Sequence, residues 1–567
     1  MNDVLLTILG VDPREAKYSL DGRRFSARLA PIALFELLPP EKRPQAVIAF
    51  CTEESRSRTF PELEKALSGK ASVCAAPIPN VGEPQDVNAF LREMVKTCEQ
   101  YRDAIFTVDV THGFRHLSFL MYIGALYLSA LGRVTVDRVY YALLNALPNA
   151  SPFFDLTPLL RLPNWIHAVR TLREAGSAKL IGRLVHNHSG GPAIEKIMER
   201  VSDAHAAGLP IELGREVDRF FSQKTEPFRK ILRDDRLPLS ERVADQLKTV
   251  LEPYRLTGTA SKTWGKKSLV LDEEELKRQA KLVDDLLQRR NLPAALGLMN
   301  EWTVSWVLWN RGSVDNWLDF PRHRRIAAGQ IGALAAAAKD SELAPLLTSD
   351  QRNLADYWRA LSDVRNALHH HGMRRQDVFG GDFDEALQTA MSYWTEHLRH
   401  LPRLCFEFGG KRHRRLLVSP IGERPGVLFS AVKRTAADGG PPDFCLVVCS
   451  GKSEPSVPEA LSHARFAGEH RLLRLEDPYA GKDERKRIIR EARRELAAAD
   501  EVLVNITGGT TLMGVVAEDL ANEARRFARP VRRFALIDKR PPEQQKLEPF
   551  VEGDILWLDE EERDADY

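Results

Sequence analysis

Short apolar runs that end in glycine or polar residues recur through the first 150 residues, and longer stretches with helical spacing lie between them. Apolar runs of about four to eight residues bounded by turn residues are typical of buried strands. Strands that alternate with helices predict a parallel sheet covered by helices on both faces. The predicted strands are Val4–Leu9, Ala46–Cys51, Ala104–Val110 and Arg138–Leu144, and the predicted helices include Pro84–Tyr101 and Leu117–Leu131.

The middle of the chain, from about Pro163 to Arg403, has a different pattern. Strand signals almost vanish there and amphipathic runs dominate, which predicts an all-helical domain. A polar stretch at Thr257–Lys267 interrupts it and has the character of an insertion. The predicted helices are Trp165–Ala175, Ala193–Ala207, Asp272–Arg290, Leu292–Asn310, Arg325–Lys339 and Asn353–His371.

The last 150 residues return to strands that alternate with helices. The segment Phe408–Arg415 combines two glycines with a basic cluster and is a candidate linker. A charged run at Asp483–Glu495 predicts a solvated helix face. The predicted strands are Arg415–Val418, Asp443–Cys449, Glu501–Ile506 and Arg533–Ile537.

The two ends of the chain resemble each other. AVIAFCTEES matches DFCLVVCSGKS, and 60 residues separate Cys51 from Thr111 where 58 separate Cys449 from Thr507. The same order of elements at matched spacing predicts the same Rossmann-like fold twice, on either side of a helical insert. The expected fold class is therefore α/β plus all-α, with domains at residues 1–160, 161–407 and 412–567.

Composition narrows the class of protein. The 567 residues are 43% hydrophobic and 28% charged, which is ordinary for globular domains. A net charge of +2 excludes a protein that holds nucleic acid by bulk charge. Leu117–Leu131 is too short for a membrane span and predicts a buried helix. The cysteines form no CxxC pair, so we expect no zinc site and a reducing, cytoplasmic location; they are Cys51, Cys74, Cys98, Cys405, Cys445 and Cys449.

Two strand-end loops carry the candidate binding chemistry. Thr111-His112-Gly113 and Thr507-Gly508-Gly509 each follow a predicted strand and precede a predicted helix. Backbone N–H groups at a helix start are free to bind anions, and glycine lets a ligand approach closely, so such loops suit phosphates. The alternative is a threonine helix cap with a tight turn and no ligand.

These loops carry a family resemblance. TVDVTHGFRH at Thr107–His116, with ILGVDP at Ile8–Pro13 and CTEES at Cys51–Ser55, resembles the CARF sensor domain of CRISPR-associated proteins. NITGGTTLMG at Asn505–Gly514 resembles the same signature more loosely. The family binds cyclic oligoadenylate, a ring messenger made by type III CRISPR complexes, at a CARF dimer.

The resemblance implies two sets of ligand-binding residues. Arg115 and Lys452 would meet phosphates of the ring, while hydroxyls and backbone groups would read the sugar edge. The first set is Gly10, Val11, Asp12, Thr52, Glu53, Thr111, His112, Gly113 and Arg115. The second set is Ser419, Gly422, Ser450, Lys452, Thr507, Gly508, Gly509, Thr510, Thr511 and Lys539.

The helical middle contains LSDVRNALHHHG at Leu361–Gly372. Arg365, Asn366 and His370 match the motif of HEPN ribonucleases, in which an arginine is followed by asparagine and, four to six residues on, by histidine. On a regular helix Arg365 shares a face with His369 rather than His370, so His369 and His371 stay open as alternatives. Histidines that merely complement the dipole of a helix C-terminus are the structural alternative.

The motif suits metal-independent RNA cleavage. When the 2′-OH of RNA attacks the adjacent phosphate, one group must move protons and a cation must stabilise the crowded phosphorane. Histidine suits the first task and arginine the second, while Asn366 would orient either of them. The products would be a 2′,3′-cyclic phosphate and a 5′-hydroxyl. HEPN sites form where two motif copies meet, so one copy per chain implies a homodimer.

Together the motifs predict a cyclic oligoadenylate-activated, single-strand RNA endonuclease of type III CRISPR antiviral defence. The expected activator is cyclic tetra-adenylate, although the sequence leaves ring size and RNA preference open, and we expect no cofactor, metal or membrane partner. The C-terminal CARF-like domain would degrade the ring as an off-switch, sense it, or serve dimerisation. The alternative is a messenger-controlled RNA-binding regulator that does not cut. Candidates for ring degradation are Ser419, Lys452, Thr510, Thr511 and Lys539.

Overall fold

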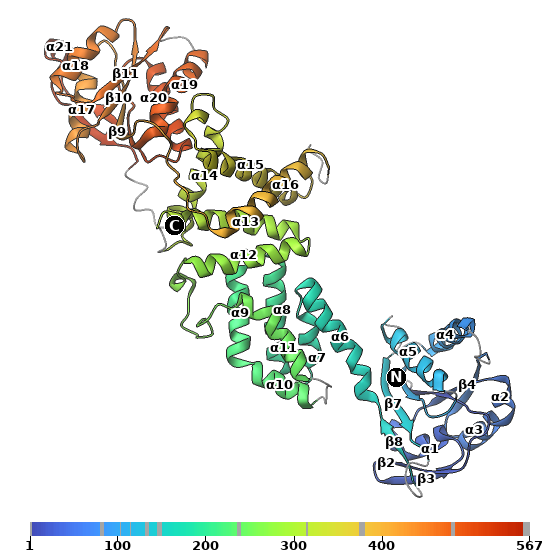
Figure 1. The fold of residues 1–567 in the computed structure, drawn as a ribbon. Helices are drawn as coiled ribbons and strands as arrows, with labels where there is room; N and C mark the ends of the chain where they lie inside the picture. Colours follow the sequence, from blue (N-terminus) through green and yellow to red (C-terminus); the bar gives the residue numbers. More distant parts are fainter. Residues whose placement is uncertain are drawn as a thin grey trace. The chain divides into compact units, whose positions relative to one another are not determined.

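A computed structural model gives the fold of the chain (Figure 1). The chain divides into two compact units: Met1–Ser202 with Arg219–Glu252, and Asp203–Asp218 with Pro253–Tyr567. The domain boundaries predicted from the sequence stay a prediction. The structure describes residues 3–79, 84–101, 104–113, 115–130, 135–144, 150–234, 240–312, 316–373, 380–477 and 482–559.

The first α/β region contains an eight-stranded sheet in the order β3-β2-β8-β7-β6-β1-β4-β5. Five adjacent strands, from β7 through β6, β1 and β4 to β5, run parallel to one another, and β8 pairs antiparallel to β7. β1 and β4 have no exposed residues, as expected of parallel strands covered on both faces. The strands are β1 (Asp3–Ile8), β2 (Ala16–Leu20), β3 (Arg23–Ala27), β4 (Ala46–Cys51), β5 (Ser72–Pro77), β6 (Ile105–Asp109), β7 (Thr135–Ala142) and β8 (Ser151–Asp155).

Helices cover both faces of this sheet. One hydrophobic core packs α4 and α5 against one face, and a second packs α1 and α3 against the other. The predicted buried helix is confirmed on the inner side of α5, where Leu117, Met121 and Leu128 are buried. No helix in the described part of the chain is long and apolar enough to cross a bilayer. The helices are α1 (Ala30–Leu37), α2 (Glu53–Arg58), α3 (Phe60–Leu67), α4 (Pro84–Cys98) and α5 (Arg115–Ala130).

The second α/β region contains a six-stranded sheet in the order β11-β10-β9-β12-β13-β14. All neighbours are parallel except β13 and β14. Read from β5, the first sheet has the same strand order and polarity over six strands, so the predicted repeat of one fold is confirmed; β2 and β3 are an addition to the first copy. The strands are β9 (His413–Pro420), β10 (Phe444–Ser450), β11 (Glu469–Leu475), β12 (Ala499–Asn505), β13 (Val531–Ile537) and β14 (Asp554–Trp557).

Two helix layers also cover the second sheet (Figure 1). α19 and α20 pack on one face, and α17 and α18 pack on the other. The charged run at Asp483–Glu495 lies on α19, whose apolar stripe of Ile488, Ala492 and Leu496 is buried, so only part of that run faces solvent. The helices are α17 (Gly426–Ala437), α18 (Val457–His463), α19 (Lys482–Ala498), α20 (Thr511–Arg526) and α21 (Pro542–Leu547).

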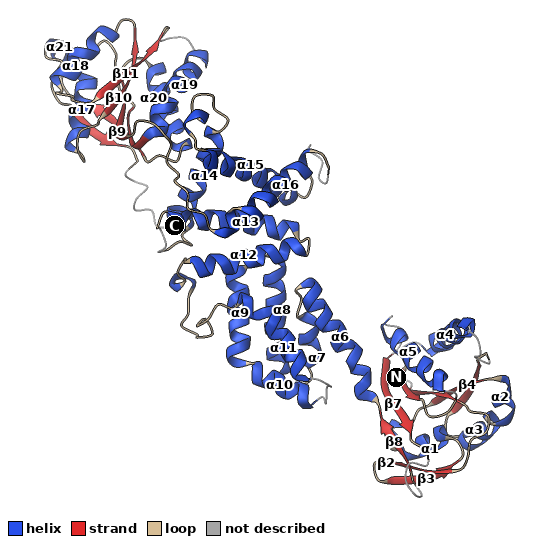
Figure 2. Cartoon of the chain, in the orientation of Figure 1, coloured by secondary structure: helices blue, strands red, loops and turns tan. Residues whose placement is uncertain are grey.

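Between residues 157 and 412, every regular element in the described part is helical, as predicted (Figure 2). α13 has the predicted bounds, and α12 begins after an Asp272 cap whose side chain accepts from the Glu275 N–H. The helices are α6 (Thr157–Ala175), α7 (Lys179–Val185), α8 (Gly191–Ala206), α9 (Pro210–Gln223), α10 (Thr225–Asp234), α11 (Ser240–Leu251), α12 (Glu273–Gln288), α13 (Leu292–Asn310), α14 (Arg325–Ala337), α15 (Ser349–His369) and α16 (Asp382–Glu396).

Candidate functional sites

Both sheets present loops at the carboxyl ends of their central strands. In the first sheet β1 lies between β4 and β6, and in the second β9 lies between β10 and β12. Crossovers leave the central pair in opposite directions, which creates the crevice where ligands bind to open α/β sheets. The loops after β1, β4 and β6, and after β9, β10 and β12, are the ones that the sequence singled out.

The same hydrogen-bond arrangement holds one threonine in the loop after β6 and one in the loop after β12. In the first sheet the Thr7 hydroxyl donates to the Asp109 carboxylate at 2.9 Å, and that carboxylate accepts from the Thr111 N–H at 3.0 Å. The Ala142 N–H of β7 then donates to the Thr111 hydroxyl at 2.9 Å. The loop after β6 is thereby tied to both neighbouring strands, β1 and β7.

In the second sheet Asn505 occupies the place of Asp109. Its amide donates to Ser419 Oγ at 3.0 Å and its carbonyl accepts from the Thr507 N–H at 2.9 Å. The Leu536 N–H of β13 donates to the Thr507 hydroxyl at 2.9 Å. The two copies thus share the arrangement, with an ionisable group in the first and a neutral one in the second.

Asp109 and His112 form a buried titratable pair. Burial raises the pKa of Asp109, and the hydrogen bonds from Thr111 and Thr7, which act in the opposite direction, do not reverse this. Burial lowers the pKa of His112. The Ala30 N–H, at the start of α1, donates to His112 Nε2 at 2.8 Å, which requires that nitrogen to be unprotonated. His112 is therefore held neutral as a cap for α1.

The other predicted residues of the first set lie at the same sheet edge but differ in exposure. Thr52 is buried and caps α2 by accepting from the Ser55 N–H. Gly10 approaches the third loop, since a Cβ on it would lie 3.6 Å from the Gly113 nitrogen. Val11 is half-buried, while Asp12, Glu53 and Gly113 are exposed. Arg115 is the first residue of α5, and its side chain lies outside the described residues.

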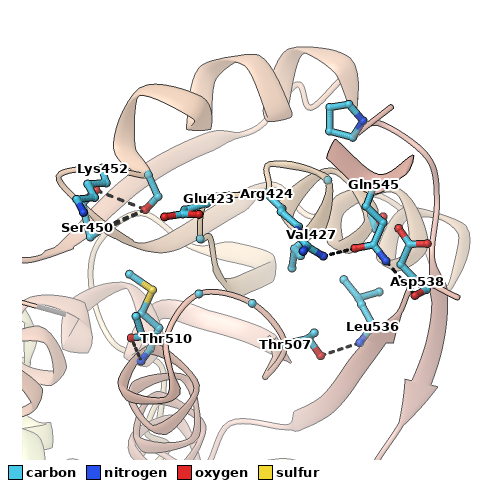
Figure 3. Close-up of a pocket in the computed structure, with 18 of the residues that line it drawn as sticks. Glu423, Arg424, Val427, Ser450, Lys452, Thr507, Thr510, Leu536, Asp538 and Gln545 are labelled. Carbon is cyan, nitrogen blue, oxygen red and sulfur yellow. Dashed lines mark hydrogen bonds between the residues drawn. The ribbon is translucent and has the colours of Figure 1, made fainter. Parts of the chain in front are cut away.

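The second sheet carries a cavity of about 770 Å³ at its carboxyl edge (Figure 3). Ser450 and Lys452 lie on one wall and Arg424, Gln545 and Asp538 on another, above the Thr507 loop. α20 begins directly after this loop, capped by the Thr510 side chain. Seven predicted residues line the cavity: Gly422, Ser450, Lys452, Thr507, Gly508, Gly509 and Thr510.

Three predicted residues of the second set do not line this cavity. Ser419 is fully buried and accepts from Asn505, so it supports the loop from beneath. Thr511 lines a neighbouring depression on the α20 side. Lys539 points to Asp554 at 2.9 Å, and this contact raises the pKa of the exposed ammonium.

Sequence reasoning missed several polar groups of the cavity. Glu423 and Arg424 follow Gly422 directly, so the polar loop after β9 contributes two residues to the cavity beyond the predicted Gly422. Asp538 and Gln545 come from the connection between β13 and β14, which includes α21. Gln545 bonds to Arg424 and to the carbonyl of Arg540 at 2.7 Å, which holds α21 over the cavity. No sequence pattern signals such a long-range contact.

The Arg-His segment lies at the end of α15, which packs against α16, α14 and α13. The helix ends at His369, and His371 and Gly372 adopt the left-handed conformation with φ of 52° and 71°. The helix therefore ends two residues before the predicted bound at His371, and His371 rather than Gly372 is the first residue in the left-handed conformation. His370 is the C-cap residue, and its N–H donates to the Asn366 carbonyl at 3.1 Å. Asn366 Oδ1 accepts from Arg365 at 3.3 Å.

Arg365 and His369 line one cavity of about 600 Å³, and His370 and His371 are not among its lining residues in the described part of the chain. A Cβ on Gly297 of α13 would lie 3.6 Å from His369 Nε2, so this glycine gives the imidazole room. Burial and the Arg365 charge lower the pKa of His369. The described residues contain no cluster of three or more side chains placed to hold a metal ion.

A 112-residue stretch is 26% identical to the CRISPR-associated protein MJ1674 of Methanocaldococcus jannaschii. The match covers 19% of this chain and 17% of that protein, so the chain spans only a small part of that relative. No protein-family model matches the sequence.

A solved structure also shows some likeness to the chain. It is that of a type III CRISPR defence DNA nuclease activated by cyclic oligoadenylate. The two chains are 14% identical, and the alignment covers 94% of this chain and 65% of the other with a TM-score of 0.16. A likeness this low carries no argument about fold or activity.

Proposed function

We propose that this chain is an RNA endonuclease of CRISPR defence that responds to cyclic oligoadenylate. The observation that carries the proposal is the cavity of about 770 Å³ at the second sheet, which Lys452 and Arg424 line together with a Thr-Gly-Gly-Thr loop. Cations, helix-start N–H groups and glycines that admit close approach suit a phosphate-bearing ring. The 112-residue similarity to a CRISPR-associated protein supports the same setting.

The first sheet supports a sensing role of the same kind. In the loop after β6, hydrogen bonds hold Thr111 as they hold Thr507 in the second sheet. Gly10 and Gly113 lie close together at the crevice. We therefore propose cyclic oligoadenylate as the ligand of both edges. In the second copy, Lys452 and Thr510 would position the ring for cleavage, whereas Ser419 and Lys539 act only at a distance from the cavity.

The cutting function rests on the Arg365 segment. Arg365 would stabilise the phosphorane, His370 would move protons, and Asn366, which already contacts Arg365, would orient it. One motif copy per chain fits a homodimeric HEPN site. Ring binding would favour the dimer arrangement that cuts, a coupling between two distinct sites.

The test is cleavage of labelled single-stranded RNA by the full-length protein, with and without each ring size. Ring-stimulated cleavage with 2′,3′-cyclic phosphate ends is expected, and its absence rejects the proposal. Retained RNA binding without any product would instead support a non-cutting regulator. Incubation of the Arg365→Ala protein with the ring, followed by chromatography for linear adenylates, tests the off-switch role separately; an intact ring rejects it.

A further inference from the structure

The cavity beside Arg365 and His369 has a composition that phosphate binding does not explain. Its walls come from the α8–α9 connection, from α13 and from the π-helical turn at Phe320–Arg324. Much of the lining is apolar, including Ala294, Leu298 and Ile211. An apolar wall excludes a hydrated phosphate but accepts the flat faces of a nucleobase.

Two arginines, Arg324 and Arg365, line this cavity. Arg324 is buried, and its guanidinium is held by Glu301 Oε2 at 2.7 Å and by Ser305 Oγ at 3.1 Å. Arg365 has no acidic partner among the described residues, and its Nε has no hydrogen-bond acceptor. The charge of Arg324 is thus neutralised by the protein, whereas the charge of the half-buried Arg365 has no carboxylate beside it among the described residues and is left for an external anion. This arrangement matches a backbone phosphate lying directly outside an apolar cavity.

The cavity wall also has a group suited to the edge of a base. Asn291, the residue before α13, donates from Nδ2 to the Ala206 carbonyl at 2.8 Å. This bond fixes the amide plane and leaves Oδ1 as an acceptor. A fixed amide beside an apolar slot is the kind of group that distinguishes bases by their edges.

We propose that this cavity binds the nucleobase of the single-stranded RNA nucleotide next to the cut phosphate and so sets base preference. The inference rests on the proposed RNA cleavage and names the part of the substrate that the site recognises. The base enters the cavity, Asn291 meets its edge, and the adjoining phosphate lies against Arg365. His369 forms part of the wall, which leaves proton transfer to another histidine.

The test fills the cavity at Ala294, a half-buried residue of α13 that lines it. Ala294→Leu is compared with Ala437→Leu, a change at an exposed alanine that ends α17. Cleavage is measured with ring present on four short RNAs that differ in one base beside the cut. We expect the wild type to prefer one base at least tenfold, and Ala294→Leu to raise KM at least tenfold and flatten the preference.

A second measurement keeps the inference separate from the proposed function. Binding of the four single-stranded RNA homopolymers is measured directly for wild type and both variants, with circular dichroism as the check on folding. Weaker and less selective binding by folded Ala294→Leu supports the cavity even if no RNA is cut. Equal binding by all three proteins, or equal cleavage of the four RNAs by the wild type, overturns it.

Discussion

Gly422 lies so close to Gly509 that a Cβ on Gly422 would come within 2.8 Å of the Gly509 Cα. The loop after β9 and the loop after β12 therefore touch backbone to backbone at the edge of the large cavity. In the first sheet the corresponding Gly10 is less closely packed, because a Cβ on it would lie 3.6 Å from the Gly113 nitrogen. One copy of the fold thus requires glycine for space, and the other does not.

The first prediction compares these two glycines. Gly422→Ala should displace the Thr507 loop, weaken ring binding by the second copy at least tenfold, and cost about 1–3 kcal/mol of stability through overpacking. Gly10→Ala, at ordinary van der Waals distance, should do neither. Calorimetric titration with the ring and thermal unfolding give the two readouts. Equal effects of both substitutions would contradict the geometry.

The second prediction concerns Lys452 at the cavity wall. A charge-assisted hydrogen bond to phosphate contributes about 1.5–3 kcal/mol, so Lys452→Ala should weaken ring binding by roughly tenfold or more. Lys486→Ala, on the exposed face of α19, is the matched control with the same loss of charge. A matching loss of affinity in both variants would indicate a general charge effect rather than a site.

The third prediction concerns Arg365. Because it has no acidic partner among the described residues, Arg365→Ala should leave folding and ring binding intact. Ring-stimulated RNA cleavage should fall about 100-fold or more, as when a transition-state charge loses its partner. Arg352→Ala, an exposed arginine on the same helix, should retain activity. Wild-type cleavage rates for Arg365→Ala would remove the arginine from the mechanism.

The fourth prediction separates two adjacent histidines. His370 has the motif spacing, whereas His369 lies on the cavity wall with Arg365. His370→Ala should abolish cleavage at saturating RNA, which is an effect on kcat. His369→Ala should mainly raise KM and relax base preference. The opposite division of kcat and KM effects would assign proton transfer to His369.

The fifth prediction concerns pH and Asp109. Burial raises its pKa in the folded protein, so above the ordinary value of 3.8 the unfolded chain loses this proton first. The folded state then binds more protons, and the free energy of unfolding falls as pH rises through that window. Asp109→Asn cannot titrate, and Asn505 shows that the amide fits the same arrangement.

The gain in stability of Asp109→Asn over wild type should therefore grow as pH rises from about 4 towards the raised pKa. Amide hydrogen exchange in β6 at a series of pH values measures it in the sheet concerned. A difference that is constant with pH would mean that Asp109 does not titrate in this window.

Strands with buried, apolar surfaces were predictable from the sequence, and strands with few buried residues were not. β4 has the predicted bounds because all of its residues are buried, so the pattern is continuous. β3 and β14 contain no buried residue, and β2, β8 and β11 contain too few for a clear run. Local sequence carries little signal for such strands, because pairing with a neighbour stabilises them.

The sequence by itself determined the repeated α/β fold, the helical middle and the loops at the strand ends, because hydrophobic spacing and turn residues act locally. Only the tertiary structure decided which of those loop residues share a cavity. It places Ser419 beneath the loop, adds Arg424 and Gln545 to the wall, and shows that Arg365 and His369, which helical spacing already put on one face, line a shared cavity. These placements follow from contacts between residues distant in sequence, which local spacing does not fix.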